Sequence, residues 1–187
     1  LITRSKLLSE EIILIYGATS GVGSAAIQIA KDVGATVIST VGTEDKKEYA
    51  YNLGSDYVLL HSENIVSEVI DITNNIGVDV VFEHIGEDTW NQSMRVLRKG
   101  GKIVTCGSTT GPKVNIDLRF LFSKQQTIMG TTMSDIPTYL EVMKKINSNV
   151  YKPFIDKVFL FEDVIQAHNR MQNRNHYGKI VLVPNYD

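Results

Sequence analysis

The sequence predicts an α/β fold built on a doubly wound parallel sheet. Short apolar runs alternate with stretches of helical periodicity along most of the chain. Several of the helical stretches open with Ser, Thr or Asp, which cap helix N-termini. A glycine-rich turn joins the first apolar run to the first long helix. Strand–helix repetition of this kind builds βαβ units with right-handed crossovers, so we expect a Rossmann-type sheet of about six strands.

The expected elements follow in order along the chain. Apolar and β-branched runs predict strands at residues 12–16, 36–40, 57–60, 78–82, 102–105 and 127–130. Helical periodicity predicts helices at residues 22–33, 46–53, 65–74 and 88–97. After residue 152 the rhythm changes, and we expect a strand at 158–161, a helix at 161–171 and a strand at 179–183. We therefore divide the chain into a dinucleotide-binding domain, residues 1–150, and a C-terminal segment, residues 151–187.

Composition narrows the class of protein. The 187 residues carry 19 basic and 21 acidic side chains, for a net charge of −2, without a basic stripe. Nucleic acid is therefore not an expected partner. No apolar run reaches the length of a membrane span and the start does not resemble a signal peptide, so we expect a cytoplasmic protein without a membrane partner. The single cysteine, Cys106, leaves no internal disulfide and is interpreted as a small buried residue at a strand end.

The turn after the first strand carries the clearest functional signal. Gly21-x-Gly23-x-x-Ala26 fits the pattern G-x-G-x-x-G/A, and Gly17 directly follows the strand. Small residues let a backbone approach phosphates, while the helix N-terminus offers free N–H groups and the positive end of the helix dipole. The alternative is a tight strand-to-helix turn without a ligand. Because both the strand and the helix are present, we expect a bound dinucleotide.

The end of the second strand bears on which dinucleotide binds. NAD sites place Asp or Glu about twenty residues after the turn, where the side chain binds the adenine ribose. Here that place holds residues 40–43, without a carboxylate, and Gly42, Thr43 and Lys46 leave room and donors for a 2′-phosphate. Glu44 and Asp45 favour NAD instead, unless they serve the dipole of the following helix. We expect NADP in preference to NAD.

Several motifs together resemble the medium-chain dehydrogenase/reductase superfamily, in its zinc-type alcohol dehydrogenase and quinone oxidoreductase branches. The resemblance covers essentially the whole chain. It rests on the turn at 18–23, Leu-Gly-Ser-Asp at 53–56, Gly-Val-Asp-Val-Val at 77–81, Glu-His-Ile-Gly at 83–86 and the glycines of residues 97–107. In this superfamily the cofactor domain lies between an N-terminal, GroES-like catalytic domain and a short return segment. The resemblance therefore implies that residues 151–187 complete a catalytic domain whose larger part is missing here.

The resemblance also implies which residues bind the cofactor. His61 is expected beside the adenosine phosphate, with an ordinary exposed histidine as the alternative. His84 is expected near the nicotinamide ribose, and a proton-relay role is the less favoured interpretation. The full set of expected cofactor-binding residues is Thr19, Ser20, Gly21, Val22, Gly23, Thr40, Gly42, Thr43, Lys46, His61, His84, Ile85, Gly107, Ser108, Thr109 and Thr131. No catalytic residue and no metal ligand is assigned within the chain.

The implied reaction is hydride transfer between nicotinamide and an alcohol or carbonyl compound, as in zinc-type alcohol dehydrogenases, with zinc held only by the missing domain. One alternative is a zinc-independent, NADPH-dependent quinone or enoyl reductase, and another is a non-catalytic nucleotide-binding or assembly module. A short-chain dehydrogenase does not fit, because no tyrosine has a lysine four residues on. The resemblance and the weakly charged edge strand near Thr127 predict a homodimer.

Overall fold

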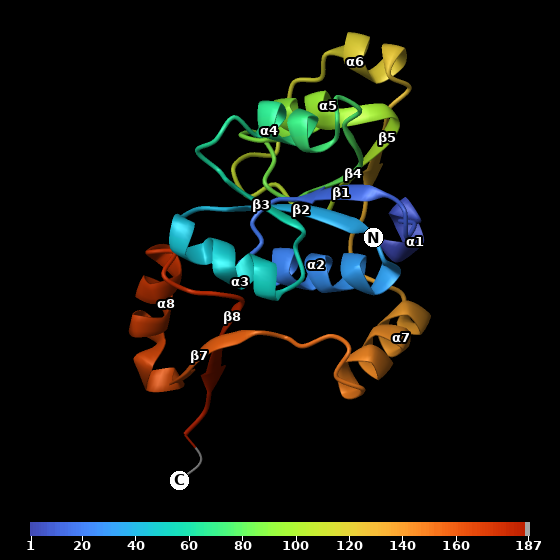
Figure 1. Cartoon of the computed structure of the whole chain (residues 1–187). Helices are drawn as coiled ribbons and strands as arrows, with labels where there is room; N and C mark the ends of the chain where they lie inside the picture. Colours follow the sequence, from blue (N-terminus) through green and yellow to red (C-terminus); the bar gives the residue numbers. More distant parts are fainter. Residues whose placement is uncertain (186–187) are drawn as a thin grey trace.

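The computed structural model describes residues 1–185 and contains the predicted sheet. Six parallel strands lie in the order β3-β2-β1-β4-β5-β6 (Figure 1). Their bounds are β1 Ile12–Ile15, β2 Thr36–Val41, β3 Tyr57–Leu60, β4 Val78–Glu83, β5 Leu97–Thr105 and β6 Thr127–Gly130. This order reverses between β1 and β4, which is the arrangement of a Rossmann fold. The predicted fold class is confirmed.

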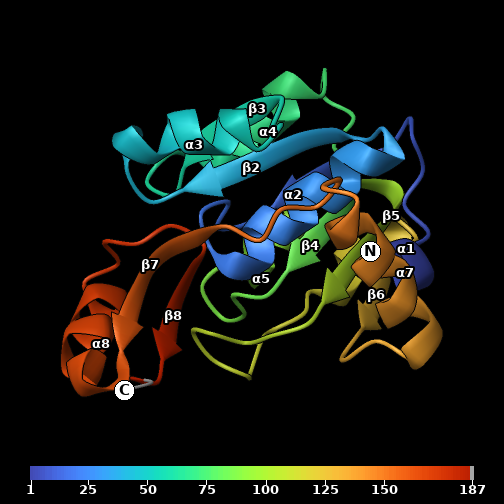
Figure 2. The same cartoon turned by 90° about the horizontal axis from the view of Figure 1, so that it is seen from below.

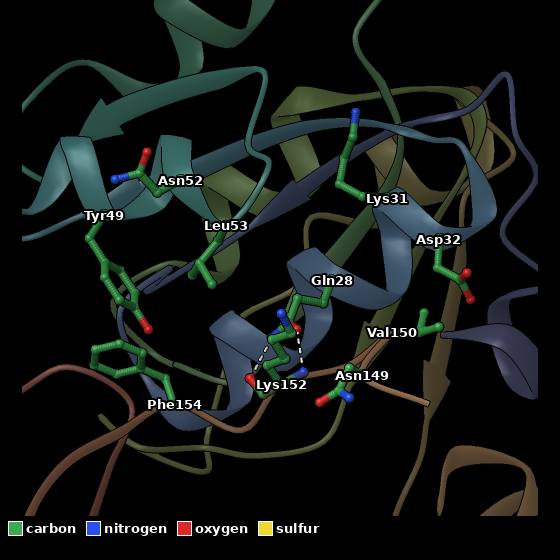
Figure 3. Close-up of a pocket in the computed structure, with 10 residues that line it drawn as sticks. All are labelled: Gln28, Lys31, Asp32, Tyr49, Asn52, Leu53, Asn149, Val150, Lys152 and Phe154. Carbon is green, nitrogen blue, oxygen red and sulfur yellow. Dashed lines mark hydrogen bonds between the residues drawn. The ribbon is translucent and has the colours of Figure 1, made fainter. Parts of the chain in front are cut away.

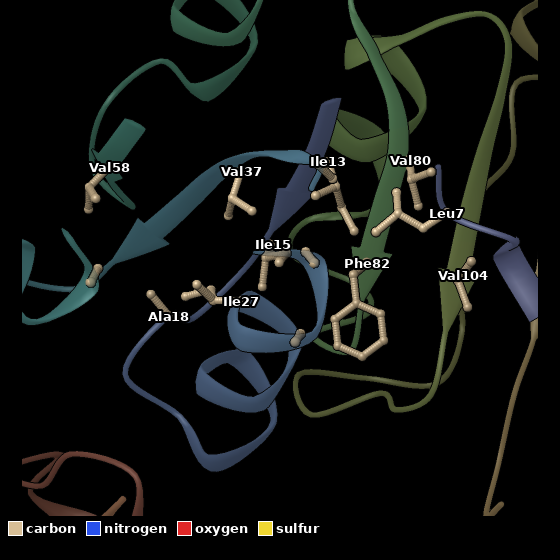
Figure 4. Packing of buried hydrophobic residues seen from close by; sticks show 14 of the residues in the cluster. Leu7, Ile13, Ile15, Ala18, Ile27, Val37, Val58, Val80, Phe82 and Val104 are labelled. Atoms are coloured by element: carbon tan, nitrogen blue, oxygen red, sulfur yellow. The ribbon is translucent and has the colours of Figure 1, made fainter. Parts of the chain in front are cut away.

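Helices cover both faces of the sheet (Figure 1). On one face lie α2 (Gly21–Val33), the short 3₁₀ helix η1 (Glu44–Lys46) and α3 (Lys47–Asn52), and on the other lie α4 (Ile65–Ile72) and α5 (Trp90–Val96). Successive strand side chains point to opposite faces, so Ile13 and Ile15 pack with the first group (Figure 4), while Leu14 packs with the second. Trp90 is buried in this second cluster.

Three helices were not predicted from the sequence. They are α1 (Ile2–Ser5), α6 (Leu118–Ser123) and α7 (Ile136–Asn147). The clearest missed signal belongs to α7, where the Asp135 side chain caps the helix by accepting a hydrogen bond from the N–H of Thr138 at 2.8 Å. Pro137 stands in the first turn, where proline is well tolerated.

The C-terminal segment forms a small unit of its own beside the main sheet (Figure 2). It contains β7 (Ile155–Leu160), the 3₁₀ helix η2 (Phe161–Asp163), α8 (Val164–Gln172) and β8 (Lys179–Val183), with β7 and β8 paired in parallel. Asp156 of β7 and Arg170 of α8 join the two elements through hydrogen bonds of 2.5 and 2.9 Å. The predicted boundary at residue 150 between the two parts of the chain stays a prediction. Residues 186 and 187 of the predicted C-terminal segment lie outside the residues that the structure describes.

The structure bears on two expectations drawn from composition, one about membrane spans and one about Cys106. Throughout residues 1–185, every helix is too short or too polar to span a bilayer. The interpretation of Cys106 as buried was wrong, since this side chain is exposed. Strand β5 ends at Thr105, and Cys106 already belongs to the following loop, where its N–H donates to the carbonyl of Glu83 at 3.1 Å.

Candidate dinucleotide-binding site

The glycine-rich turn is held tightly against the start of α2. Gly17 has a φ of +64°, a conformation that glycine adopts without strain. Ser20 caps the helix, because its hydroxyl accepts a hydrogen bond from the N–H of Gly23 at 2.9 Å. A Cβ on Gly23 would overlap the carbonyl oxygen of Gly17, so this position requires glycine for packing within the turn itself.

The N-terminus of α2 is suited to an anion. The N–H groups of Gly21 and Val22 are too early in the helix to reach an intrahelical carbonyl. Lys179 of β8 extends over this end, since a Cβ on Gly21 would overlap the end of the lysine side chain. Free N–H groups, the positive end of the helix dipole and an ammonium group therefore gather where a pyrophosphate would lie. Lys179 was not identified from the sequence.

Two further residues of the predicted set shape the turn from either side. Thr40 is fully buried, its hydroxyl accepting from the N–H of Gly17 at 3.1 Å and its carbonyl from the N–H of Ala18 at 2.8 Å. Thr40 therefore fixes the backbone of the turn on the side of β2. Thr19, in contrast, is half-buried, and its carbonyl accepts from the N–H of Gly178 in the C-terminal segment at 2.7 Å.

Basic groups surround the loop that follows β2. Gly42 and Thr43 are exposed there, and a Cβ on Gly42 would lie 3.7 Å from the ring of His61. The Lys46 ammonium donates to the carbonyl of Arg174 at 2.7 Å. Burial, together with the charges of Arg174 and Lys46, lowers the pKa of His61. The structure thus adds Arg174, which no local motif indicates, to the predicted Lys46 and His61.

The two acidic side chains of this loop each have a partner, through an ion pair in one case and a hydrogen bond in the other. Glu44 forms an ion pair with Lys47 at 3.2 Å. Asp45 accepts a hydrogen bond from the Tyr177 hydroxyl at 3.1 Å. Side-chain hydrogen bonds from Thr43 and Tyr177 lower the pKa of Asp45, so this carboxylate is held ionised and partnered.

The predicted residues after β4, β5 and β6 also lie together. His84 is buried, and its Nε2 lies 2.9 Å from the carbonyl oxygen of Tyr16, so this nitrogen carries the proton and donates. The hydroxyl of Thr109 donates to the His84 carbonyl at 2.9 Å, and Gly107 packs against the same carbonyl. Thr131 joins this edge through a 2.9 Å bond from its N–H to Thr105. Ile85 and Ser108 lie in the same two loops, half-buried and exposed respectively.

A buried carboxylate fixes the loop that carries His84 and Ile85. Glu83 is fully buried, and its Oε1 accepts from the N–H groups of Ile85 at 2.7 Å and Gly86 at 3.2 Å. The hydroxyl of Thr89 donates to both carboxylate oxygens, at 3.0 and 2.9 Å. The sequence motif included Glu83 without indicating this anchoring role.

A cavity of about 630 Å³ lies away from these residues, between α2, α3 and the chain at 149–154 (Figure 3). Gln28 and Lys152 bridge its floor with reciprocal hydrogen bonds of 2.7 and 3.2 Å, drawn dashed in Figure 3. None of the predicted cofactor-binding residues lines it. Within residues 1–185, no three His, Cys, Asp or Glu side chains converge as a metal site would require. The described chain therefore offers no zinc donor set.

The strand order and the phosphate turn define a Rossmann-type dinucleotide-binding domain. More specifically, the chain belongs to the zinc-binding dehydrogenase family, whose family model matches residues 21–148. It is a cofactor-binding domain of the medium-chain dehydrogenase/reductase superfamily, which binds nicotinamide cofactors. The resemblance found in the sequence is confirmed.

Known relatives span several named activities. The chain is 30% identical over 187 residues to a quinone oxidoreductase of Salmonella typhimurium, covering 94% of this chain and 57% of that protein. A solved NAD-dependent alcohol dehydrogenase is 30% identical with a TM-score of 0.90, over 97% of this chain and 53% of that one. A 2-octenoyl-CoA carboxylase reductase, solved with NADP and 2-octenoyl-CoA, is 26% identical with a TM-score of 0.89, over 98% and 46%. The chain spans about half the length of such relatives.

Proposed function

We propose that the chain is the cofactor-binding domain of an NADP(H)-dependent oxidoreductase. The observation that carries this proposal is the loop after β2, where the cations Lys46 and Arg174 lie with His61 while Glu44 and Asp45 are both partnered. The lowered pKa of His61 leaves its imidazole neutral at pH 7, so it serves as a hydrogen-bond donor. A 2′-phosphate favours cationic groups and is repelled by a free carboxylate. The NADP bound by the solved 2-octenoyl-CoA carboxylase reductase supports the same choice.

The reaction we propose is hydride transfer at the nicotinamide ring, chemistry that the cofactor supplies when bound. The residues of this chain bind and orient it. The start of α2 and Lys179 face the pyrophosphate, and the loops after β4, β5 and β6 face the nicotinamide side. The Nε2–H of His84 donates a hydrogen bond to the backbone carbonyl of Tyr16, so this side chain joins the end of β4 to the end of β1.

Two substrate classes have support from the relatives. The quinone oxidoreductase and the 2-octenoyl-CoA carboxylase reductase favour a quinone or a conjugated enoyl substrate. The alcohol dehydrogenase favours an alcohol or carbonyl compound. NADPH oxidation by the full-length protein with a quinone, an enoyl-CoA and an aldehyde separates the two classes. Metal analysis and chelation of the same preparation show whether zinc, supplied from outside the described residues, takes part.

Calorimetric titration of the chain with NADPH, NADH and ADP-ribose tests the cofactor assignment. We expect NADPH to bind most tightly. Tighter binding of NADH would overturn the NADP preference while keeping the nicotinamide assignment. Failure of all three nucleotides to bind would favour the non-catalytic assembly module instead.

We further propose that the C-terminal unit packs against a catalytic domain. Its small sheet leaves large apolar side chains exposed, among them Ile155, Val158, Leu160 and Phe161. An exposed apolar group of this kind marks an interaction surface. The occupant we assign is the other half of the protein, since the relatives are about twice as long as this chain. Co-expression of the missing half should protect this unit from proteolysis, and unchanged cleavage would refute the assignment.

A homodimer through β6 is also part of this proposal. β6 is the last strand of the sheet, and Thr131 directs its N–H to β5. Because alternate residues of a strand direct their polar groups to opposite sides, Ile128 and Gly130 direct theirs outward, where the Gly130 carbonyl accepts a 3.3 Å hydrogen bond from Arg4. Two such edges can pair across a two-fold axis. We also place the protein in the cytoplasm, which cell fractionation tests.

A further inference from the structure

We propose that Tyr177 is a positioning residue for NADP specificity, because it holds the Asp45 carboxylate in a hydrogen bond beside the 2′-phosphate loop. This inference rests on the proposed function and deepens it. It assigns a role to a residue of the C-terminal segment, far in sequence from the loop that it contacts.

The first contact is made by the tyrosine hydroxyl. It lies 3.1 Å from Oδ2 of Asp45, the second residue of η1. Burial and the neighbouring Asp45 raise the pKa of Tyr177, so the hydroxyl keeps its proton at neutral pH and acts as donor. Asp45 is exposed, and without this donor its carboxylate keeps only the hydrogen bond from Thr43, so it can turn toward Gly42 and Lys46.

The second contact is made by the tyrosine ring. The Lys46 ammonium lies 5.4 Å from the ring centroid, within the range of a cation–π contact. The same ammonium donates to the Arg174 carbonyl three residues earlier in the segment. Tyr177 and Arg174 therefore both contact the Lys46 ammonium and hold it beside the loop after β2.

The tyrosine itself is rigidly placed. Its N–H donates to Oδ1 of Asp156 at 3.2 Å, and Asp156 is locked by Arg170. Its ring packs on Tyr49 of α3, with centroids 5.1 Å apart. A side chain fixed at the backbone and the ring directs its hydroxyl to one place, which here is the exposed carboxylate of Asp45.

The chemical consequence is a choice between cofactors. A 2′-phosphate carries negative charge, so an unpartnered carboxylate in this loop disfavours NADP by repulsion. The adenine ribose hydroxyls of NAD, in contrast, donate hydrogen bonds to a free carboxylate. Loss of the Tyr177 hydrogen bond to Asp45 should therefore weaken the binding of NADPH and leave the binding of NADH unchanged or tighter.

The test is Tyr177→Phe in the full-length protein, with dissociation constants for NADPH and NADH measured by fluorescence titration. We expect the NADPH constant to rise by about threefold to tenfold and the NADH constant to stay or fall. Tyr151→Phe is the matched control, because Tyr151 also donates to an aspartate, Asp32, at 2.7 Å and is remote from the loop. It should leave both constants unchanged.

A double variant completes the test. In an Asp45→Asn background, Tyr177→Phe should no longer change the ratio of the two constants, because the repelling charge is gone. An unchanged ratio in Tyr177→Phe alone, with NADPH still the tighter ligand, would overturn the role of Tyr177 and leave the proposed function standing. Tighter binding of NADH by the unaltered protein would instead overturn the NADP assignment itself. Equal losses of affinity for NADPH and NADH would show that Tyr177 stabilises the structure without choosing between the cofactors.

Discussion

The hydroxyl of Ser93 donates a 2.6 Å hydrogen bond to the buried carboxylate of Glu83. Ser93 lies in α5 and Glu83 ends β4, so this bond ties a helix to the strand that leads into the loop of His84 and Ile85. The pair is fully buried and the carboxylate has no cationic partner in the described chain. Hydroxyl and N–H donors alone satisfy it, which makes the network sensitive to the loss of any member.

Replacing Glu83 by Ala should therefore destabilise the fold. The N–H groups of Ile85 and Gly86 and two hydroxyls would lose their acceptor, so we expect unfolding to become easier by about 3 kcal/mol. Ser93→Ala should lower the free energy of unfolding by about 1–2 kcal/mol. Urea denaturation measures both, and Glu48→Ala on the exposed face of α3 serves as control. Equal effects of Glu83→Ala and the control would contradict the network.

The two glycines at the start of α2 should respond differently to valine. In Gly21→Val the new side chain meets only the flexible end of Lys179, so the fold should persist while nucleotide affinity falls by more than about tenfold. In Gly23→Val it meets the backbone of Gly17, so stability itself should fall by about 2 kcal/mol or more. Thermal unfolding and calorimetric titration together separate the two effects. Equal loss of stability in both variants would argue against this distinction.

The C-terminal unit should weaken in acid through Asp156. Hydrogen bonds from Arg170 hold the pKa of Asp156 below its ordinary value of 3.8, and the nearby His176 acts in the same direction. A depressed carboxylate pKa stabilises the folded unit above pH 4, and this contribution is lost as the pH falls through the folded-state value. Proteolysis of the segment after residue 150 should therefore accelerate below pH 4. Asp156→Asn should remove that pH dependence, and an unaltered acid profile in this variant would exclude Asp156 as its cause.

A charge on the edge of β6 should separate the proposed dimer. A Cβ on Gly130 meets no atom within 4 Å, so Gly130→Glu fits the isolated chain. Across a two-fold axis, two such carboxylates repel each other and the dimer should dissociate. Sedimentation velocity measures the change, and thermal unfolding checks that the fold is retained. A dimer that survives Gly130→Glu would place the interface elsewhere.

The strands and the phosphate turn could be predicted because their signals are local. Apolar runs such as the one at Ile13 and Ile15, followed by the glycines and Ser20, carry both the element and its boundary. Helix α7 was missed although its signals are also local, because Asp135 caps it and apolar residues such as Ile136 and Leu140 recur at helical spacing. These apolar residues remain exposed in the described chain.

The basic residues of the tail could not be predicted for a different reason. Arg174 and Lys179 reach the site only because β8 returns to the turn at Thr19. No spacing in the sequence encodes such a contact, since it depends on how the segment packs against the sheet. Lys46 and His61, which follow predicted strands, could be identified because parallel strands end at a common edge.

The parallel bridge between Ser20 and Gly178 has a consequence for how the protein is made. Nearly the whole chain lies between these two residues, so the bridge forms only after their long separation has been closed. A ribosome releases the glycine turn well before Gly178, so this bridge cannot form until the segment that leads into β8 has emerged. The phosphate turn and the C-terminal segment are thus joined only after both have been synthesised.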